Sequence, residues 1–273
     1  KRFIMRRQAF EFMDLPQTPR CLRDSIVESL GNAIRWSGVY KNATTVFSEF
    51  CASLQSDKLL ELCSGSGEPA AILLDTLNKQ GKKLPCFLIS DLFPVNSKME
   101  KVVEQFPDNI EAINTPLDAL SVPDSIPHSA RVFISALHHF TPDQARSILR
   151  DSAEKGKPIF ILEPMNRRLM SVLKLGFFFF LSIMLNPIFS KHDRLLKVML
   201  TYPIPLIPLM GMWDGGISVM RMYKEEELMA LTSIIDANFQ WKFHNIPVAW
   251  GGSMSVFIGN PHEAISGCES ANK

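Results

Sequence analysis

The feature that most constrains the fold of this chain is a short apolar run that ends in a glycine-rich turn. Residues 58–70 read KLLELCSGSGEPA. The apolar part predicts a buried strand, and Pro69 suits the first position of a helix because its missing N–H would have no partner there. Gly65 and Gly67 allow the backbone to approach a ligand closely. This stretch therefore predicts a strand, a tight turn and a helix that together form a cofactor-binding loop.

Two classes of cofactor use a loop of this kind. The spacing Gly65-x-Gly67-x-x-Ala70 fits a dinucleotide fingerprint, but Glu68 would place a carboxylate beside phosphates at the helix N-terminus. A cofactor with a cationic sulfonium and an amino-acid tail tolerates carboxylates, and Glu61, just before the turn, is placed to face an ammonium group. A third interpretation is an ordinary strand–helix turn, in which Glu68 only interacts with the helix dipole.

At these residues the chain resembles the class I S-adenosylmethionine-dependent methyltransferases, whose first motif is an acidic residue followed by alternating glycines. Glu61, Gly65 and Gly67 match that motif, and Cys63 stands where its first glycine usually falls. The resemblance extends over about residues 55–165. It implies a Rossmann-like core with S-adenosyl-L-methionine as cofactor, held in part by Glu61, Cys63, Gly65 and Gly67.

A second candidate cofactor residue ends the next buried strand. The run from Pro85 to Asp91 is apolar and finishes in a carboxylate. In a parallel sheet, ligands lie at the carboxyl ends of the strands, so Asp91 is expected at the same crevice as the glycine turn. The resemblance implies that Asp91 accepts hydrogen bonds from both ribose hydroxyls. The alternative is a helix cap or a turn aspartate.

The resemblance also implies an acidic residue after the third strand, in contact with the adenine amino group. Asp118 is the matching position, although aspartate also favours turns for local reasons. Leu92, Ala119 and Ser135 are assigned to the same cofactor site.

Paired histidines follow the fourth predicted strand, which runs from Arg131 to Ala136. His138 and His139 should therefore face the crevice, where an imidazole can take a proton from an attacking hydroxyl or amine near neutral pH. Thr141, Pro142 and Gln144 then predict the start of a helix with a capping box. The alternative is that one histidine packs in the core and the other only borders the cofactor.

Composition limits the class of protein. The chain has 273 residues, 46% of them hydrophobic, and a net charge of +1, with no long run of like charge. It can bury a large core as one domain with an insertion, and it lacks the basic footprint of a nucleic-acid-binding protein. Its five cysteines show no Cys-x-x-Cys spacing, which fits a reducing, cytoplasmic compartment better than disulfides or a zinc site. No metal is expected.

The N-terminal segment, 1–54, is predicted to hold an arm and two helices. Helically spaced apolar residues follow Leu22 and end at Gly38, and a shorter helix follows. In many methyltransferases of the resembled class such an arm folds over cofactor and substrate. Phe10, Phe12 and Asp14 are therefore candidates for a lid over the substrate, or else for an extended segment packed on the body.

An apolar insertion at 166–213 is the most unusual part of the sequence. Leu169 to Phe189 is almost wholly apolar, with Lys174 as its only charge, and a second apolar run reaches Trp213. Three interpretations are open: a hydrophobic helical lid that forms a substrate pocket, contact with a membrane interface, and a true membrane span. The lid interpretation places the substrate against Phe177 to Phe180, and either of the first two implies an apolar substrate.

Polar chemistry returns at 214–260, where the chain loosely resembles some uncharacterised bacterial class I methyltransferases. In those proteins an Asp-Gly turn, a serine and an arginine lead into a helix after the insertion. Asp214, Arg221 and Tyr223 are candidates for substrate contact, and the alternative is a glycine turn with a surface ion pair. A helix at 224–236 and two antiparallel strands should follow, before a tail at 261–273.

Together these patterns predict an α/β fold: a doubly wound, mostly parallel seven-stranded sheet with helices on both faces and an apolar helical insertion. The core is divided between 55–165 and 214–260. The predicted function is methyl transfer from S-adenosyl-L-methionine to an apolar or amphipathic small molecule, a class that includes lipid-like molecules. The alternatives are a nicotinamide-dependent oxidoreductase and a non-catalytic, membrane-associated binding or scaffold protein on the same fold.

Overall fold

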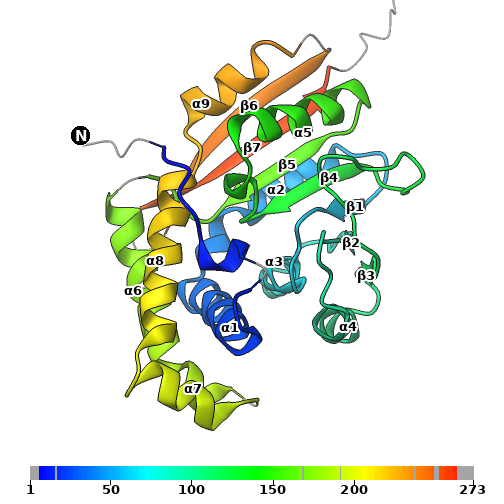
Figure 1. Ribbon diagram of the computed structural model, residues 1–273. Coiled ribbons are helices and arrows are strands. Elements are labelled where there is room, and N and C mark those ends of the chain that lie inside the picture. Colours follow the sequence, from blue (N-terminus) through cyan, green and yellow to red (C-terminus); the bar gives the residue numbers. More distant parts are fainter. Residues whose placement is uncertain are drawn as a thin grey trace, which may run out of the picture.

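The structure is a computed structural model that describes residues 6–15, 17–167, 169–190, 192–235, 238–248 and 252–262. Figure 1 shows one sheet with helices on both of its faces and a separate group of helices beside it. Position 236 of the predicted helix and most of the predicted tail lie outside the described residues.

The sheet has seven strands in the order β3-β2-β1-β4-β5-β7-β6. Strands β1 to β5 pair in parallel, and β7 pairs antiparallel with both β5 and β6. This confirms the predicted α/β, mostly parallel sheet with a terminal antiparallel pair. The strands are β1 Lys58–Glu61, β2 Cys86–Ile89, β3 Ile110–Ala112, β4 Ala130–Ile134, β5 Ile159–Glu163, β6 Phe239–Pro247 and β7 Ser253–Pro261.

Two hydrophobic clusters cover the two faces of the sheet. One joins the sheet to α1–α4 and the other joins it to α5 and α9. The helices of the body are α1 Arg20–Ser37, α2 Thr44–Ala52, α3 Glu68–Lys79, α4 Asn96–Gln105, α5 Pro142–Glu154 and α9 Glu225–Thr232, with 3-10 turns η1 Phe12–Asp14, η2 Val39–Asn42 and η3 Leu137–His139.

Local signals set several helix ends as predicted. Gly38 stops α1 in a left-handed conformation, with φ of 58°, which glycine adopts without steric cost. Thr141 and Gln144 form the expected capping box at the start of α5. One prediction was wrong in detail: α9 ends at Thr232, earlier than the predicted end at 236.

The insertion forms three helices, α6 Leu169–Phe189, α7 Arg194–Thr201 and α8 Leu206–Arg221, which Figure 1 shows beside α1. The expected Asp-Gly turn is absent, because α8 runs straight through Asp214 and across the predicted boundary at 213. Tight packing explains why a helix tolerates glycines here. A Cβ added at Gly211 would lie 2.6 Å from Cδ1 of Ile183 on α6, so glycine allows α6 and α8 to approach each other closely.

Candidate cofactor and active site

The turn after β1 places alternate residues in the left-handed backbone region. The φ angles are 60° at Cys63, 57° at Gly65 and 77° at Gly67. Cys63 therefore adopts the conformation that a glycine would adopt without strain, and its departure from the motif does not change the turn. At Gly67 a Cβ would lie 2.6 Å from Cδ1 of Ile89, so only glycine fits beside β2.

Glu61 ends β1 beneath this turn, and its side chain is fully buried. Neither carboxylate oxygen has a hydrogen-bond partner among the described residues. The hydroxyls of Ser64 and Ser90 donate instead to the backbone carbonyl of Glu61, at 3.2 and 2.7 Å. Burial raises the pKa of Glu61 to about 8; the nearby Ser64 hydroxyl acts to lower it, although that hydroxyl is directed at the backbone carbonyl, and the charge of Asp91 raises it further. A buried carboxyl without a partner is costly, which marks it as a position for a ligand donor.

Asp91 connects the end of β2 to the glycine turn. Its Oδ2 accepts a hydrogen bond from the backbone N–H of Gly65 at 2.8 Å, and its Oδ1 accepts one from the N–H of Phe93 at 2.9 Å. The carboxylate is only partly buried. Asp91 therefore lies at the crevice, as predicted, and it also orders the loop that forms the crevice.

Asp118 does not directly end a strand, because β3 stops at Ala112. The loop after β3 lies next to the crevice, because the backbone N–H of Leu117 donates a hydrogen bond to the carbonyl of Asp91 at 2.9 Å. The side chain of Asp118 is exposed and accepts a hydrogen bond from the N–H of Leu120. Ala119 is buried beside it, and Leu92 is exposed.

The Cys63 thiol shows that these carboxylates surround one turn. Burial raises the pKa of Cys63, and the charges of Asp91, Asp118 and Glu61 raise it further. The thiol is therefore neutral and unreactive. Asp91 and Asp118 thus make the crevice around Cys63 acidic, which suits a cationic ligand better than a phosphate.

Ser135, after β4, borders the crevice from the other side. It has a positive φ of 58°, and its hydroxyl lies 3.2 Å from the hydroxyl of Tyr40. Tyr40 comes from η2 and is fully buried, which raises its pKa. The sequence around Tyr40, WSGVYKNATT at residues 36–45, contains no motif that marks it as a site residue.

His138 and Glu163 form a buried pair. The backbone N–H of His138 donates to Oε1 of Glu163 at 3.1 Å, and Nδ1 of the ring lies 3.0 Å from Oε2. A carboxylate at Nδ1 holds that nitrogen protonated and leaves Nε2 as the acceptor. Glu163 ends β5, and the signal in the sequence that could have found it is its place at the carboxyl end of a buried strand.

His139 occupies a different environment. Its side chain is about 38% exposed, and Nδ1 lies 3.3 Å from Oδ1 of Asp14. Nη1 of Arg221 lies 3.4 Å from the same ring nitrogen. The two histidine rings are 4.3 Å apart between centroids. His139 therefore takes part in an ion-pair network with the N-terminal arm, whereas His138 is held by Glu163.

Arg221, on α8, binds the arm of residues 6–15 at three points. Its Nε and Nη2 donate to the carbonyl of Ala9, at 3.0 and 2.5 Å. Its guanidinium also lies 3.1 Å from Glu11 and 2.7 Å from Asp14. Burial raises the pKa of Glu11 in spite of that cation. At Asp14 burial also acts to raise the pKa, but hydrogen bonds with His139 and Arg221 outweigh it and lower the value to about 2.

The other predicted substrate residues lie in the same junction between arm and α8. Asp214 is buried and accepts hydrogen bonds from the N–H groups of Phe12 at 2.8 Å and Met13 at 3.1 Å. Phe10 lies against the Trp213 ring, with centroids 5.6 Å apart. Tyr223 donates to the carbonyl of Phe140, and Arg6 stacks over its ring. The carboxylate of Asp214 and the guanidinium of Arg221 are occupied by the arm, so their contact with substrate stays a prediction.

Glu11, His138 and His139 place ligand atoms within 4.8 Å of one another, close enough to share a metal ion. The positive charge at this point is already supplied by Arg221, which is bonded to Glu11. A dication would therefore face a buried guanidinium, which makes the cluster a poor metal site.

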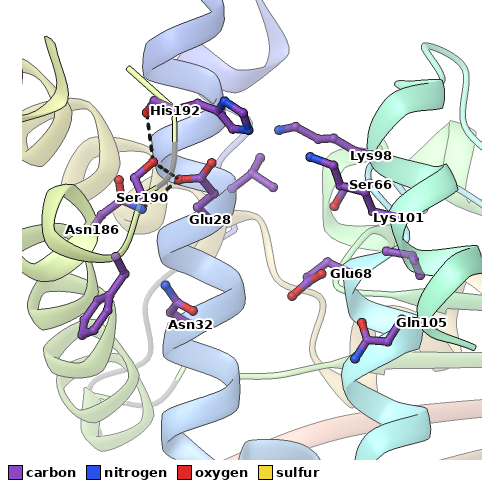
Figure 2. A pocket seen from close by; sticks show the side chains of 13 residues that line it. Glu28, Asn32, Ser66, Glu68, Lys98, Lys101, Gln105, Asn186, Ser190 and His192 are labelled. Carbon is purple, nitrogen blue, oxygen red and sulfur yellow. Dashed lines mark hydrogen bonds between the residues drawn. The ribbon is translucent and has the colours of Figure 1, made fainter. Parts of the chain in front are cut away.

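A cavity of about 500 Å³ lies beside the glycine turn, between α1, α4 and the end of α6. Figure 2 shows Glu28, Asn186 and His192 on one side and Ser66, Glu68 and Lys98 on the other. Glu68 pairs here with Arg35 of α1. The expected repulsion between Glu68 and phosphates is thus weakened, because Arg35 compensates the carboxylate.

The phenylalanines at 177–180 do not line this cavity. Phe179 packs against α1 in a cluster with Leu22 and Ile26. Phe177 and Phe180 are 62% and 45% exposed. The inner face of α6 therefore packs on α1, and the expected pocket for substrate against these residues is not found there.

No known sequence family and no curated protein matches the chain. Among solved structures it is similar to the plantazolicin methyltransferase BpumL in complex with SAH, with a TM-score of 0.54, 12% identity, and coverage of 88% of this chain and 90% of that one. It is also similar to the methyltransferase domain of bacterial CtHen1, with a TM-score of 0.46, 9% identity and coverage of 81% and 99%. An O-methyltransferase family protein from Burkholderia thailandensis gives a TM-score of 0.43, 14% identity and coverage of 83% and 58%.

At these low sequence identities the similarity concerns the fold alone. The argument for the fold rests on BpumL, whose TM-score is 0.54. In this chain the antiparallel β7 lies between β5 and β6. The described chain has the fold of the class I S-adenosylmethionine-dependent methyltransferases.

Proposed function

We propose that this protein transfers a methyl group from S-adenosyl-L-methionine to an apolar or amphipathic small molecule. The observation that carries the proposal is the buried carboxyl of Glu61, which has no partner among the described residues and lies beneath the glycine turn. An ammonium group bound there would supply the missing hydrogen bonds and favour the charged carboxylate. BpumL, which has the same fold, was solved with SAH.

The residues of the crevice fit each part of this cofactor. Glu61 would hold the ammonium group, and the alternating left-handed turn would let the backbone lie close to the amino-acid tail. Asp91 would accept from the ribose hydroxyls, and Asp118 and Ala119 would border the adenine. When bound, the cofactor supplies an electrophilic methyl group on a sulfonium.

His138 is the candidate general base. Its Nε2 is left as acceptor because Glu163 holds Nδ1 at 3.0 Å. Nε2 can take the proton of an attacking hydroxyl or amine, and the Glu163 carboxylate then stabilises the imidazolium. The rest of the protein's contribution is alignment of the nucleophile with the methyl carbon. The arm contributes by covering the histidines, through Glu11 and Asp14.

The apolar character of the acceptor is supported by the border of the site. Phe10 and Trp213 are about half exposed and pack together where the arm meets α8. Phe12 packs edge-on against Phe10. Together they offer an aromatic surface at the edge of the histidine region, of the kind that lines sites for small apolar ligands.

A nicotinamide oxidoreductase is less well supported. The usual dinucleotide-binding sheet has six parallel strands in the order 3-2-1-4-5-6, whereas this sheet carries an antiparallel β7 between β5 and β6. The acidic crevice around Cys63 would also repel a pyrophosphate.

Isothermal calorimetry with S-adenosylmethionine, SAH, NAD and NADP tests the proposal. We expect the first two to bind and the nucleotides not to bind. Glu61→Gln should weaken SAH binding by about 1.5 to 3 kcal/mol, the usual effect of losing a charged hydrogen bond. Glu111→Gln is a matched control, because Glu111 is an exposed side chain on β3 that pairs only with Lys58. Binding of NAD without any response to SAH would refute the proposal.

A further inference from the structure

An unusual share of the exposed apolar side chains lies on the insertion. Among the residues that the structure describes, 24 large hydrophobic residues are exposed, and 15 of them fall between Leu173 and Trp213. We call this surface the apolar face. Its members are Leu173, Phe177, Phe180, Leu181, Ile188 and Phe189 on α6, Leu195, Leu196 and Met199 on α7, Tyr202 and Ile204 in the connection, and Leu206, Leu209, Met212 and Trp213 on α8.

The three helices pack against one another, and Figure 1 shows them together at one side of the molecule. Single exposed apolar residues are normal on a protein surface, but a concentration on three neighbouring helices marks an interaction surface.

Helix α6 is long and apolar enough to cross a membrane, with a mean hydropathy of 1.9 over Val172–Phe189. One side of α6, however, packs against α1. Ser182 donates to the carbonyl of Ser29 on α1 at 2.6 Å, and Asn186 donates to Glu28 at 3.1 Å. Helices α7 and α8 meet at a bend of 71°. A helix that is bonded to the body along one side and apolar along the other fits a position in the plane of an interface.

Charge identifies the partner. Residues 166–213 contain six basic residues and one acidic residue, Asp193. The whole chain, by contrast, has 29 basic and 28 acidic residues. Arg167 and Lys197 pair with Glu227 and Glu28 of the body. Arg194 begins α7 next to Leu195 and is exposed. The apolar face thus lies in a segment with excess positive charge, which complements anionic headgroups.

A second copy of the chain fits this segment less well. A two-fold interface would bring the same surface of both copies together. The excess positive charges of the two segments would then approach each other, which disfavours association.

We propose that the apolar face docks into the interface of a lipid bilayer that contains anionic headgroups, with α6 lying in the plane of the membrane. The proposal does not depend on methyl transfer. It does place α8 in two environments: Leu209 and Trp213 face the bilayer, while Asp214 and Arg221 hold the arm at the site. An amphipathic molecule in the bilayer would therefore lie beside the arm.

Vesicle flotation with the intact chain tests this. The vesicles are phosphatidylcholine alone and phosphatidylcholine mixed with phosphatidylglycerol. We expect binding to the mixed vesicles to be roughly tenfold or more stronger than to the neutral ones. The triple variant Phe177→Ser, Leu195→Ser, Leu209→Ser removes one strongly exposed side chain from each helix and should lose binding by roughly tenfold or more.

Met229→Ser with Ile234→Ser is the matched control, because both residues are exposed and apolar but lie outside the insertion; it should bind as the wild type does. Arg194→Glu should reduce the preference for anionic vesicles. Circular dichroism melting and SAH calorimetry establish that each variant is folded, and they separate this test from that of the proposed function.

Failure of the intact, folded protein to bind either vesicle would overturn the proposal, as would unchanged binding by the triple variant. A stable dimer in sedimentation velocity that the triple variant dissociates, without vesicle binding, would assign the face to a second copy instead.

Discussion

At the scale of single residues, Glu61 makes the stability of the free protein depend on pH. Burial raises its pKa from 4.5 to about 8. Between these values the unfolded chain has lost the proton and the folded protein keeps it, so the stabilising contribution present below the lower value is lost as pH rises towards the higher one. We expect the melting temperature of the wild type to fall relative to Glu61→Gln from about pH 5 to about pH 8. Calorimetric melting of both proteins across this pH range checks the expectation. If their melting temperatures changed in parallel with pH, Glu61 would be ionised in the folded protein.

Cys63 offers a test of backbone strain. Its φ of 60° is costly for any residue with a Cβ. Cys63→Gly should therefore be more stable than Cys63→Ala by about 1 kcal/mol, because only glycine adopts this conformation freely. Urea unfolding of the two variants measures the difference without involving the thiol. If the alanine variant proved more stable, the turn could not have the left-handed geometry described.

The two histidines should differ in catalysis. His138→Gln should lower the rate of methyl transfer by roughly a hundredfold or more, because it removes the base that Glu163 orients. His139→Gln should have a smaller effect, since His139 bonds to the arm. SAH affinity should be nearly unchanged in both. Product formation with an accepted substrate is the measurement, and equal losses in the two variants would contradict the assignment of the base to His138.

At the scale of elements, the arm depends on α8. Arg221→Ala would leave the buried Glu11 without its cation, which typically costs about 3 kcal/mol or more. The arm should then become accessible to proteases. Adding Glu11→Gln should restore part of the stability, because it removes the unpaired charge. Arg20→Ala is the control, since Arg20 is exposed and pairs only with Asp24.

Denaturant melting and limited proteolysis report the two effects. An arm that stays protected in the single variant would mean that the remaining contacts, such as those of Asp214 with Phe12 and Met13, are enough to hold it.

At the scale of the whole molecule, the crevice joins β1, β2, β4 and their loops, so a ligand there should stabilise the sheet as a unit. SAH at about one hundred times its dissociation constant should raise the free energy of unfolding by about 2.7 kcal/mol. NAD at the same concentration should not. Thermal melting with each ligand measures this, and an equal shift with NAD would favour a dinucleotide site.

The sequence by itself determined most of the sheet and the glycine turn. Strands β1, β2, β4 and β5 are apolar runs that end in polar residues, and the capping box at Thr141 and the stop at Gly38 are local signals. Residues such as Glu61 and Asp91 could be placed because the carboxyl ends of parallel strands meet at one edge. These features depend on neighbours in sequence or on a general rule of sheet geometry.

Only the tertiary structure decided how distant residues pair. Glu163 at His138, Arg35 at Glu68 and Glu11 at Arg221 are contacts across many residues, and no local pattern specifies them. The same holds for α8, where local rules favour a turn at Asp214 and its following glycines. The stretch is instead part of α8, which packs on α6 most closely at Gly211, where a glycine that is unfavourable in an isolated helix allows two helices to approach; a Cβ at Gly215 would make only ordinary contact with Phe179, and one at Gly216 would meet nothing.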